Sequence, residues 1–243
     1  MDIIVLDMIG TYAHFRKFYT NSSSLSYTVP PRTTIAGIIA AILGRERDSY
    51  YDEFSKKNFR VGLRKLERTR TMMETINYIK ATGPKDILVP KEHTQIPFEI
   101  ITGEKGVRYR LYINHSQKAI LDELEYRAKN KKFVFPPYLG SAPFNCSIDF
   151  IDRVEGSICT SEDYVEISTL VNQNNIKQKG IDLKERNLFL VKEKMPSEIL
   201  SGRVIENIEA YIFDEYCGKL GVKLNTQYIN LKYCEGEENI LFL

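Results

Sequence analysis

The sequence predicts an α+β fold in which two helices are set among β-strands. In the first 155 of its 243 residues, short apolar runs typical of strands alternate with two stretches of helical periodicity. The later residues contain only strand-like runs, and a hydrophobic fraction of 43% is enough for a folded core. We therefore expect one domain over residues 1–155 and a β-rich C-terminal extension over residues 156–243.

The first strand and the first helix are predicted most directly. Residues 2–9 form a nearly unbroken apolar run, which is typical of a central strand. A helix is expected over about 34–43, where the chain is apolar nearly all round, so this helix should be deeply buried. Thr33 or Thr34 can cap the helix, and Gly44 can end it.

The middle of the chain is expected to carry an insertion at about 67–106, between the second and third strands of the domain. Residues 98–102 and 107–113 are predicted to form a hairpin around the turn at 103–106. The other elements expected here are a short helix at 48–57, strands at 59–63 and 69–80, and a loop at 82–95.

A second long helix is expected from Ser116, which can cap it, to about Lys131. Glu125 and Lys129 are spaced for an i,i+4 ion pair on its polar side. Its apolar side chains share one face: Ile120, Leu121, Leu124 and Ala128. The remaining strand-like runs are 146–154, 164–168, 187–191, 207–213, 229–233 and 240–243.

Without the insertion, the order of elements is strand, helix, strand, strand, helix, strand. This order is that of the ferredoxin-like, or RRM-like, βαββαβ unit. The sequence therefore predicts a ferredoxin-like domain with an inserted β-hairpin thumb, followed by the β-rich extension.

Charge is distributed unevenly along the chain, although the net charge is only +2. Residues 1–120 hold 19 Lys and Arg against 12 Asp and Glu, whereas the remainder holds 15 against 20. A basic half beside an acidic half fits a protein with a polyanion on one face and protein partners on another. Solvated faces of mixed sign would give the same counts.

The sequence carries no sign of export, membrane insertion or metal binding. The early apolar run Ile3–Leu6 is far too short to span a bilayer, and the basic flank of a signal peptide is missing. The four cysteines form no Cys-x-x-Cys pair, which excludes the usual zinc and disulfide patterns. We expect a cytoplasmic protein with reduced thiols, no metal and no cofactor.

The most informative region for function is the loop and helix start after the first strand. No acidic residue lies between Asp7 and Glu46, and basic residues alternate with aromatic ones. Cations neutralise phosphates and aromatic rings stack on bases, so single-stranded RNA sites combine the two. The alternative is an ordinary crossover loop whose aromatic residues pack on the sheet. The RNA-binding candidates here are His14, Arg16, Lys17, Tyr19, Tyr27, Arg32, Thr33 and Thr34.

A second candidate RNA track is a stripe of arginines across the predicted sheet. Arg60 and Arg64 share one face of a strand by their period-2 spacing, and Arg108 and Arg110 are similarly aligned on a later strand. The alternative is a solvated basic face without a ligand.

Metal-free RNA cleavage would need a general acid and a general base close together. The three histidines are His14, His93 and His115, and their spacing forces no pair together. Neither Gly-rich nucleotide loops nor paired metal carboxylates are present. We therefore predict no catalytic residues.

Two runs of residues resemble a known family. The run from Gly10 to Tyr19, Gly-Thr-Tyr-Ala-His-Phe-Arg-Lys-Phe-Tyr, is followed by Tyr27-Thr-Val-Pro-Pro-Arg-Thr-Thr-Ile-Ala-Gly37. Together with Ala41-Ile-Leu-Gly44, they resemble the CRISPR-associated protein 5 family of the RAMP superfamily. The likeness is greatest to members of type I-B surveillance (Cascade) complexes.

This resemblance implies a ferredoxin-like domain with a thumb that holds the repeat-derived 5′ handle of CRISPR RNA. The implied partners are the backbone subunit and the large subunit of a Cascade complex. One branch of the family cleaves precursor RNA with a Tyr, Lys and His set, but here Asn114 precedes His115 and no Lys-His pair occurs. We expect a non-catalytic RNA-binding subunit. The alternatives are a metal-independent endoribonuclease and a scaffold whose basic face meets an acidic protein.

Overall fold

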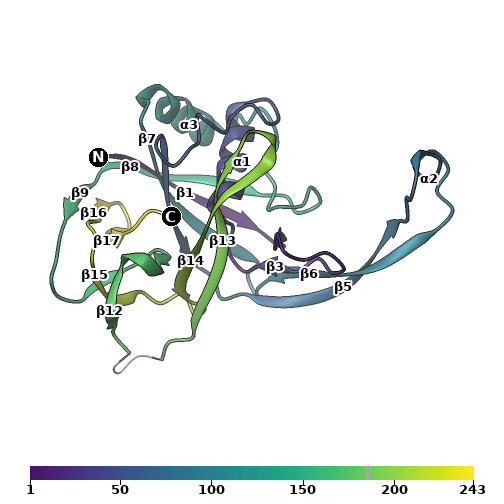
Figure 1. Ribbon diagram of the computed structural model, residues 1–243. Helices are drawn as coiled ribbons and strands as arrows, with labels where there is room; N and C mark the ends of the chain where they lie inside the picture. The colour runs from purple at the N-terminus through teal and green to yellow at the C-terminus, as the bar shows by residue number, and fades with distance from the viewer. Residues whose placement is uncertain (184–186) are drawn as a thin grey trace.

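The computed structural model describes residues 1–183 and 187–243 (Figure 1). Its main sheet has four antiparallel strands in the order β4 (Phe59–Lys65), β7 (Val107–His115), β1 (Asp2–Gly10) and β8 (Ser147–Glu155). β1 lies inside the sheet because Ile3–Leu6 are apolar and wholly buried on both faces. The strands predicted at these four places are confirmed.

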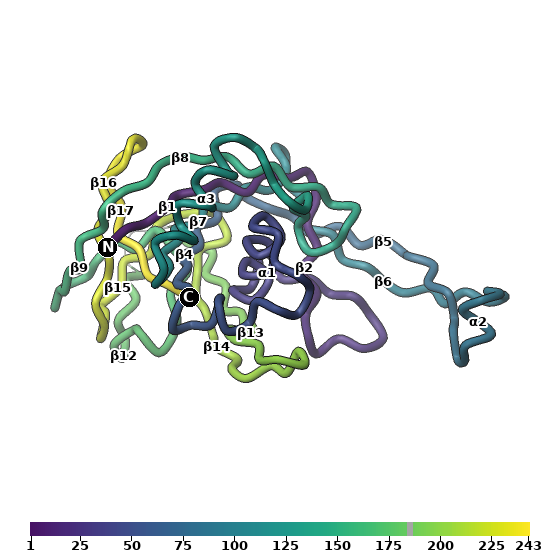
Figure 2. Tube along the Cα trace, turned by 90° about the horizontal axis from the view of Figure 1, so that it is seen from above, coloured from purple at the N-terminus to yellow at the C-terminus, as the bar shows by residue number. Residues whose placement is uncertain are grey.

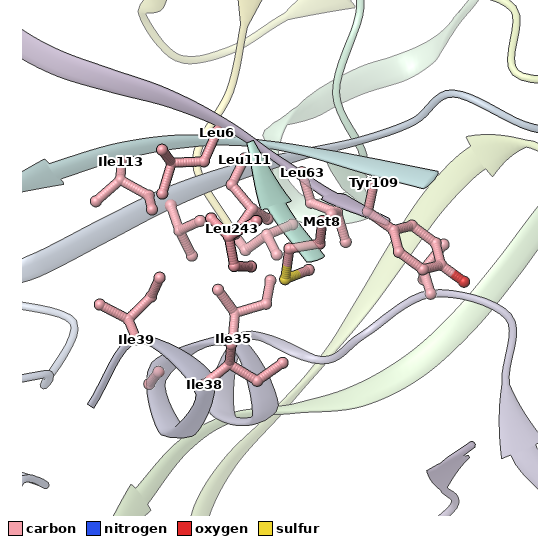
Figure 3. Packing of buried hydrophobic residues seen from close by; sticks show 14 of the residues in the cluster. Leu6, Met8, Ile35, Ile38, Ile39, Leu63, Tyr109, Leu111, Ile113 and Leu243 are labelled. Atoms are coloured by element: carbon pink, nitrogen blue, oxygen red, sulfur yellow. The ribbon is translucent and has the colours of Figure 1, made fainter. Parts of the chain in front are cut away.

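Two helices, α1 (Arg32–Leu43) and α3 (Lys118–Asn130), cover one face of the main sheet (Figure 1). Figure 3 shows Ile35 and Ile39 of α1 pointing toward the strands, and these residues and Ile38 form one cluster with buried residues of the sheet. The labelled sheet residues of this cluster are Leu6, Met8, Leu63, Tyr109, Leu111 and Ile113. The prediction that α1 is deeply buried is confirmed.

The start of α1 differs from the prediction. The carbonyl of Pro31 accepts hydrogen bonds from the N–H groups of Thr34 and Ile35 at 2.9 and 3.0 Å, so the helix begins earlier. Thr33 and Thr34 lie inside the first turn and neither caps the helix, so that prediction is wrong. Gly44 ends the helix as predicted, with a φ of 75° that favours glycine.

Two further local predictions are wrong and one is confirmed. Gln117, not Ser116, precedes α3, and Ser116 donates its hydroxyl hydrogen to Asn58 instead. Residues 48–57 form turns rather than a helix, and Asp48, the first of them, has a left-handed φ of 64°. The predicted ion pair between Glu125 and Lys129 is present at 2.5 Å.

The insertion forms a projecting thumb, which extends away from the main sheet in Figures 1 and 2. It consists of β5 (Arg70–Ile79), α2 (Pro84–Leu88) and β6 (His93–Thr102), and β5 pairs with β6 along its whole length. The predicted hairpin between 98–102 and 107–113 is therefore wrong. Both sides of β7 are taken up by β1 and β4, so β6 pairs with β5.

The C-terminal extension covers the second face of the main sheet (Figure 1). β16 (Tyr228–Tyr233) lies between β17 (Gly236–Ile240) and β9 (Ser157–Cys159). Apolar side chains of β16 and β17 join those of the main sheet in one buried cluster: Ile229, Leu231 and Ile240 with Ile3, Val5 and Tyr112.

Two further sheets complete the extension. One contains β10 (Val165–Ile167), β15 (Leu220–Leu224) and β12 (Ile176–Ile181), and the other contains β11 (Val171–Asn172), β14 (Val204–Asp214) and β13 (Leu190–Leu200). The strands predicted at 164–168, 207–213 and 229–233 are confirmed. The runs at 187–191 and 240–243 only touch the ends of β13 and β17, and the short strands β9, β11, β12 and β15 were not predicted. The division of the chain at residue 155 stays a prediction.

Charged residues also hold the extension to the sheet. Asp7 of β1 is wholly buried and accepts hydrogen bonds from Arg108 and Arg110 of β7 at 2.6 to 2.9 Å. Arg110 reaches Glu235, in the turn between β16 and β17, at 2.5 Å. Arg64 of β4 pairs with Glu238 of β17. These pairs join three strands of the sheet to the extension.

The substitution Asp7→Asn tests this network. It leaves Arg110 buried with one carboxylate fewer, so we expect the free energy of unfolding to fall by about 3 kcal/mol. Asp149→Asn is the matched control, because Asp149 pairs with Lys131 where both side chains are half-exposed. The control should cost less than about 1 kcal/mol. Equal losses in chemical denaturation would contradict the role of Asp7.

Candidate nucleic-acid interface

The loop after β1 is held between the sheet and the thumb. Ala13 forms an isolated bridge with Ile101 of β6, and Ser24 forms one with Phe98. The loop contains the short paired strands β2 (Phe15–Arg16) and β3 (Ser26–Tyr27). Gly140 packs on it so closely that a Cβ atom would lie 1.9 Å from the His14 carbonyl oxygen, so only glycine fits there.

His14 is built into this attachment and does not face solvent. Its ring stacks on Phe98 at 3.9 Å. Nδ1 lies 2.7 Å from the Glu99 carbonyl oxygen, to which it donates, and Nε2 accepts from the Ser24 hydroxyl at 3.0 Å. Burial lowers the pKa of His14, which keeps the ring neutral. His14 is one of the RNA-binding candidates, but neither of its ring nitrogens is free to bind RNA.

Three further candidates make their polar contacts within the protein: Lys17, Tyr27 and Arg32. Lys17 pairs with Glu193 at 2.8 Å; burial alone would lower its pKa, but this ion pair raises it. Tyr27 is buried and donates to the Lys194 carbonyl at 2.9 Å. Arg32 is buried and donates only to carbonyl oxygens, including that of Phe59 at 2.6 Å.

Other candidates in this region remain accessible. Arg16 is exposed and donates to the Thr20 carbonyl at 3.0 Å, and Tyr19 is 55% exposed beside Phe18. Thr33 and Thr34 are half-buried in the first turn of α1. The region therefore combines a cation, two exposed aromatic rings and a helix start.

The arginine stripe is not an open track. Arg64, Arg108 and Arg110 all pair with carboxylates, and the extension packs over the face of the sheet that carries them. The RNA-reading role of this face stays a prediction, although carboxylates of β1, of β17 and of the turn between β16 and β17 neutralise the three arginines. Arg60, on the edge strand β4, is exposed, and the side chain of Arg108 is 38% exposed.

The histidines do not form an acid–base pair. In His115, Nε2 donates to the Glu53 carbonyl at 2.9 Å and Nδ1 accepts from the Gln117 N–H at 3.0 Å, so both nitrogens are occupied, as in His14. His93 is exposed at the far end of β6. Within residues 1–183 and 187–243, no group of three or more His, Cys, Asp or Glu is arranged to hold a metal. None of the helices described is long and apolar enough to cross a bilayer.

A cleft of about 620 Å³ opens beside the start of α1, and the sequence did not predict it. Its lining includes Arg47, Tyr50 and Tyr138 from connecting loops and Arg203 from the turn between β13 and β14. No local pattern marks this site, because these residues are brought together only by the fold.

The sequence matches the model of one protein family, described as CRISPR-associated protein (Cas_Cas5), over residues 3–129. This match spans more than half of the chain, and the chain belongs to that family. A search of curated proteins finds no match.

Solved structures are similar to this chain at low sequence identity. A CRISPR protein from Archaeoglobus fulgidus is 11% identical, with 98% of this chain and 99% of that chain covered and a TM-score of 0.60. A chain from a CRISPR RNA-guided surveillance complex is 13% identical, with coverages of 91% and 92% and a TM-score of 0.49. The first of these shows a common fold along the whole chain.

The pH dependence of stability tests the position of His14. Its pKa lies below the ordinary value of 6.5, so near that pH the unfolded chain binds more protons than the folded one. Its contribution to stability is therefore complete above pH 6.5 and is lost as the pH falls toward the folded pKa. His14→Gln should flatten the pH dependence of the unfolding free energy in this range. An unchanged pH profile would contradict the assignment.

Proposed function

We propose that this chain is a non-catalytic CRISPR RNA-binding subunit of a type I-B-like surveillance complex. It would hold the 5′ repeat-derived handle and contact the backbone and large subunits, in the cytoplasm where such a ribonucleoprotein acts. Membership of the CRISPR-associated protein (Cas_Cas5) family carries this proposal. The fold shared with the CRISPR protein from Archaeoglobus fulgidus agrees with that membership.

The architecture supports the ferredoxin-like assignment. The strand order β4, β7, β1, β8 with both long helices on one face is the arrangement that a βαββαβ unit produces. The thumb leaves this unit next to the candidate loop, since bridges join the loop to β6. RNA lying along the loop would therefore also meet the base of the thumb.

We assign the direct RNA contacts to the accessible residues of the loop and helix start. Arg16 would neutralise a phosphate, Tyr19 would stack on a base, and Thr33 and Thr34 would donate to a phosphate at the start of α1. Arg60 is a further exposed cation. The other candidates would act indirectly: His14, Lys17 and Tyr27 hold the loop, Arg32 holds the start of α1, and Arg64, Arg108 and Arg110 belong to the network that holds the extension.

Replacing Arg16 tests this interface. Arg16→Ala should weaken binding of single-stranded repeat RNA and reduce the slope of log K against log salt by about 0.7, the share of one phosphate contact. Lys177→Ala is the control, because Lys177 pairs with Glu162 on the extension. Unchanged affinity and slope for Arg16→Ala would remove this loop from the interface.

The non-catalytic assignment has its own test against the endoribonuclease alternative. General acid–base catalysis needs both groups within hydrogen-bond reach of the reacting atoms, and the protein occupies the ring nitrogens of His14 and His115. Excess protein incubated with repeat RNA in EDTA should leave the RNA intact. Product that disappears in His14→Ala or His115→Ala would make the chain a nuclease.

A further inference from the structure

The entrance of the cleft beside α1 is bordered by an ion pair between two distant segments of the chain. Arg203 and Asp48 close it with an ion pair of 3.0 Å between segments that are 155 residues apart. Both residues have left-handed φ angles, 63° and 64°, which non-glycine residues adopt at a cost. Arg47 lies 3.5 Å from the same carboxylate. Two guanidinium groups thus share one carboxylate, which leaves a net positive charge at the mouth.

The walls of the cleft are aromatic. Tyr50 and Tyr51 lie with ring centroids 5.1 Å apart, and Tyr138 is 44% exposed on the other side. A second hollow of about 240 Å³ adjoins the first and shares Thr33, Tyr50 and Tyr138 with it. The exposed phenol ring of Tyr138 therefore borders both spaces, where a flat ligand can lie against it.

The lining of the cleft also includes a buried cation. Arg32 contributes a buried guanidinium whose Nε has no hydrogen-bond partner, and no carboxylate in the described part of the chain forms an ion pair with it. The acidic residue of the inner wall, Glu198, accepts the backbone N–H of Lys56 at 2.9 Å. Three guanidinium groups, those of Arg32, Arg47 and Arg203, thus line the cleft against the two carboxylates of Asp48 and Glu198.

We propose that this cleft binds one unstacked nucleotide of a single-stranded RNA, with its base against Tyr138 and its phosphate on Arg47 and Arg203. The inference rests on the proposed RNA-binding function and adds a particular site to it. The volume lies in the range of about 300–1,000 Å³ that small-ligand pockets occupy. The phosphate takes the place of Asp48 on Arg203, and so loosens the contact between the β13–β14 turn and the loop at 45–58.

Two variants and a cross-link test the site. The double variant Arg47→Ala/Arg203→Ala should lower the slope of log K against log salt for single-stranded repeat RNA by about 0.7 for the lost phosphate contact. Tyr138→Leu should weaken binding at least about five-fold, since a stacked base is worth roughly 1–3 kcal/mol. Repeat RNA carrying 4-thiouridine should cross-link to Tyr138 or Tyr50 of the unmodified protein. Lys177→Ala and thermal melting are the controls.

The outcomes separate this inference from the proposed function. If the unmodified protein binds RNA but both variants bind with unchanged affinity and slope, the cleft is not a nucleotide site and the RNA-binding function stands. If the unmodified protein binds no single-stranded RNA, both proposals fail. Should a variant not fold, the cross-link decides: adducts confined to residues outside the cleft overturn the assignment.

Discussion

The structure depends above all on the wholly buried carboxylate of Asp7. It lies between Arg108 and Arg110, and Arg110 continues to Glu235 in the extension. A buried carboxylate needs such partners, because removing it from water costs several kcal/mol. The network therefore closes the second face of the main sheet. Four-stranded RNA-binding sheets commonly stack bases on an open face, which here is occupied by β16 and β17. If the chain binds RNA as we propose, the RNA would use the edges, the loops and the thumb.

Because the second face of the main sheet is covered, the way in which His14 attaches the loop to the thumb becomes important. A two-stranded ribbon such as the thumb is marginal in water when nothing packs on it. Here its base is attached to the loop through Phe98, which stacks on His14, and through the bridge between Ala13 and Ile101. The loop that carries Arg16 and the base of the thumb are thus one unit. A nucleic acid bound to the loop is automatically placed against the thumb.

Local patterns in the sequence predicted the helices and strands, but not which distant segments of the chain pack against them. β1 and α1 follow from apolar runs that need no distant partner, and Gly44 marks a helix end by its own conformation. The partner of β6 did not follow, because local patterns do not show that both sides of β7 are already taken by β1 and β4. The alternation of side chains along β4 correctly placed Arg64 on one face of the sheet. Its partner Glu238 is 174 residues away in the chain, so no local pattern indicated that this face is covered. The cleft was missed for the same reason, since Arg203 and Asp48 meet only in the fold.

The central claim is that RNA binds the side of α1 and the loop, and that the arginine face of the sheet is closed. Arginine-specific modification with phenylglyoxal, read by mass spectrometry with and without single-stranded repeat RNA, tests it most directly. Arg16 is exposed and Arg110 is only 3% exposed. The account predicts that Arg16 reacts in the free protein and is protected by RNA, whereas Arg110 reacts in neither state. Arg64 and Arg110 that react freely and become protected by RNA, with Arg16 unaffected, would contradict it.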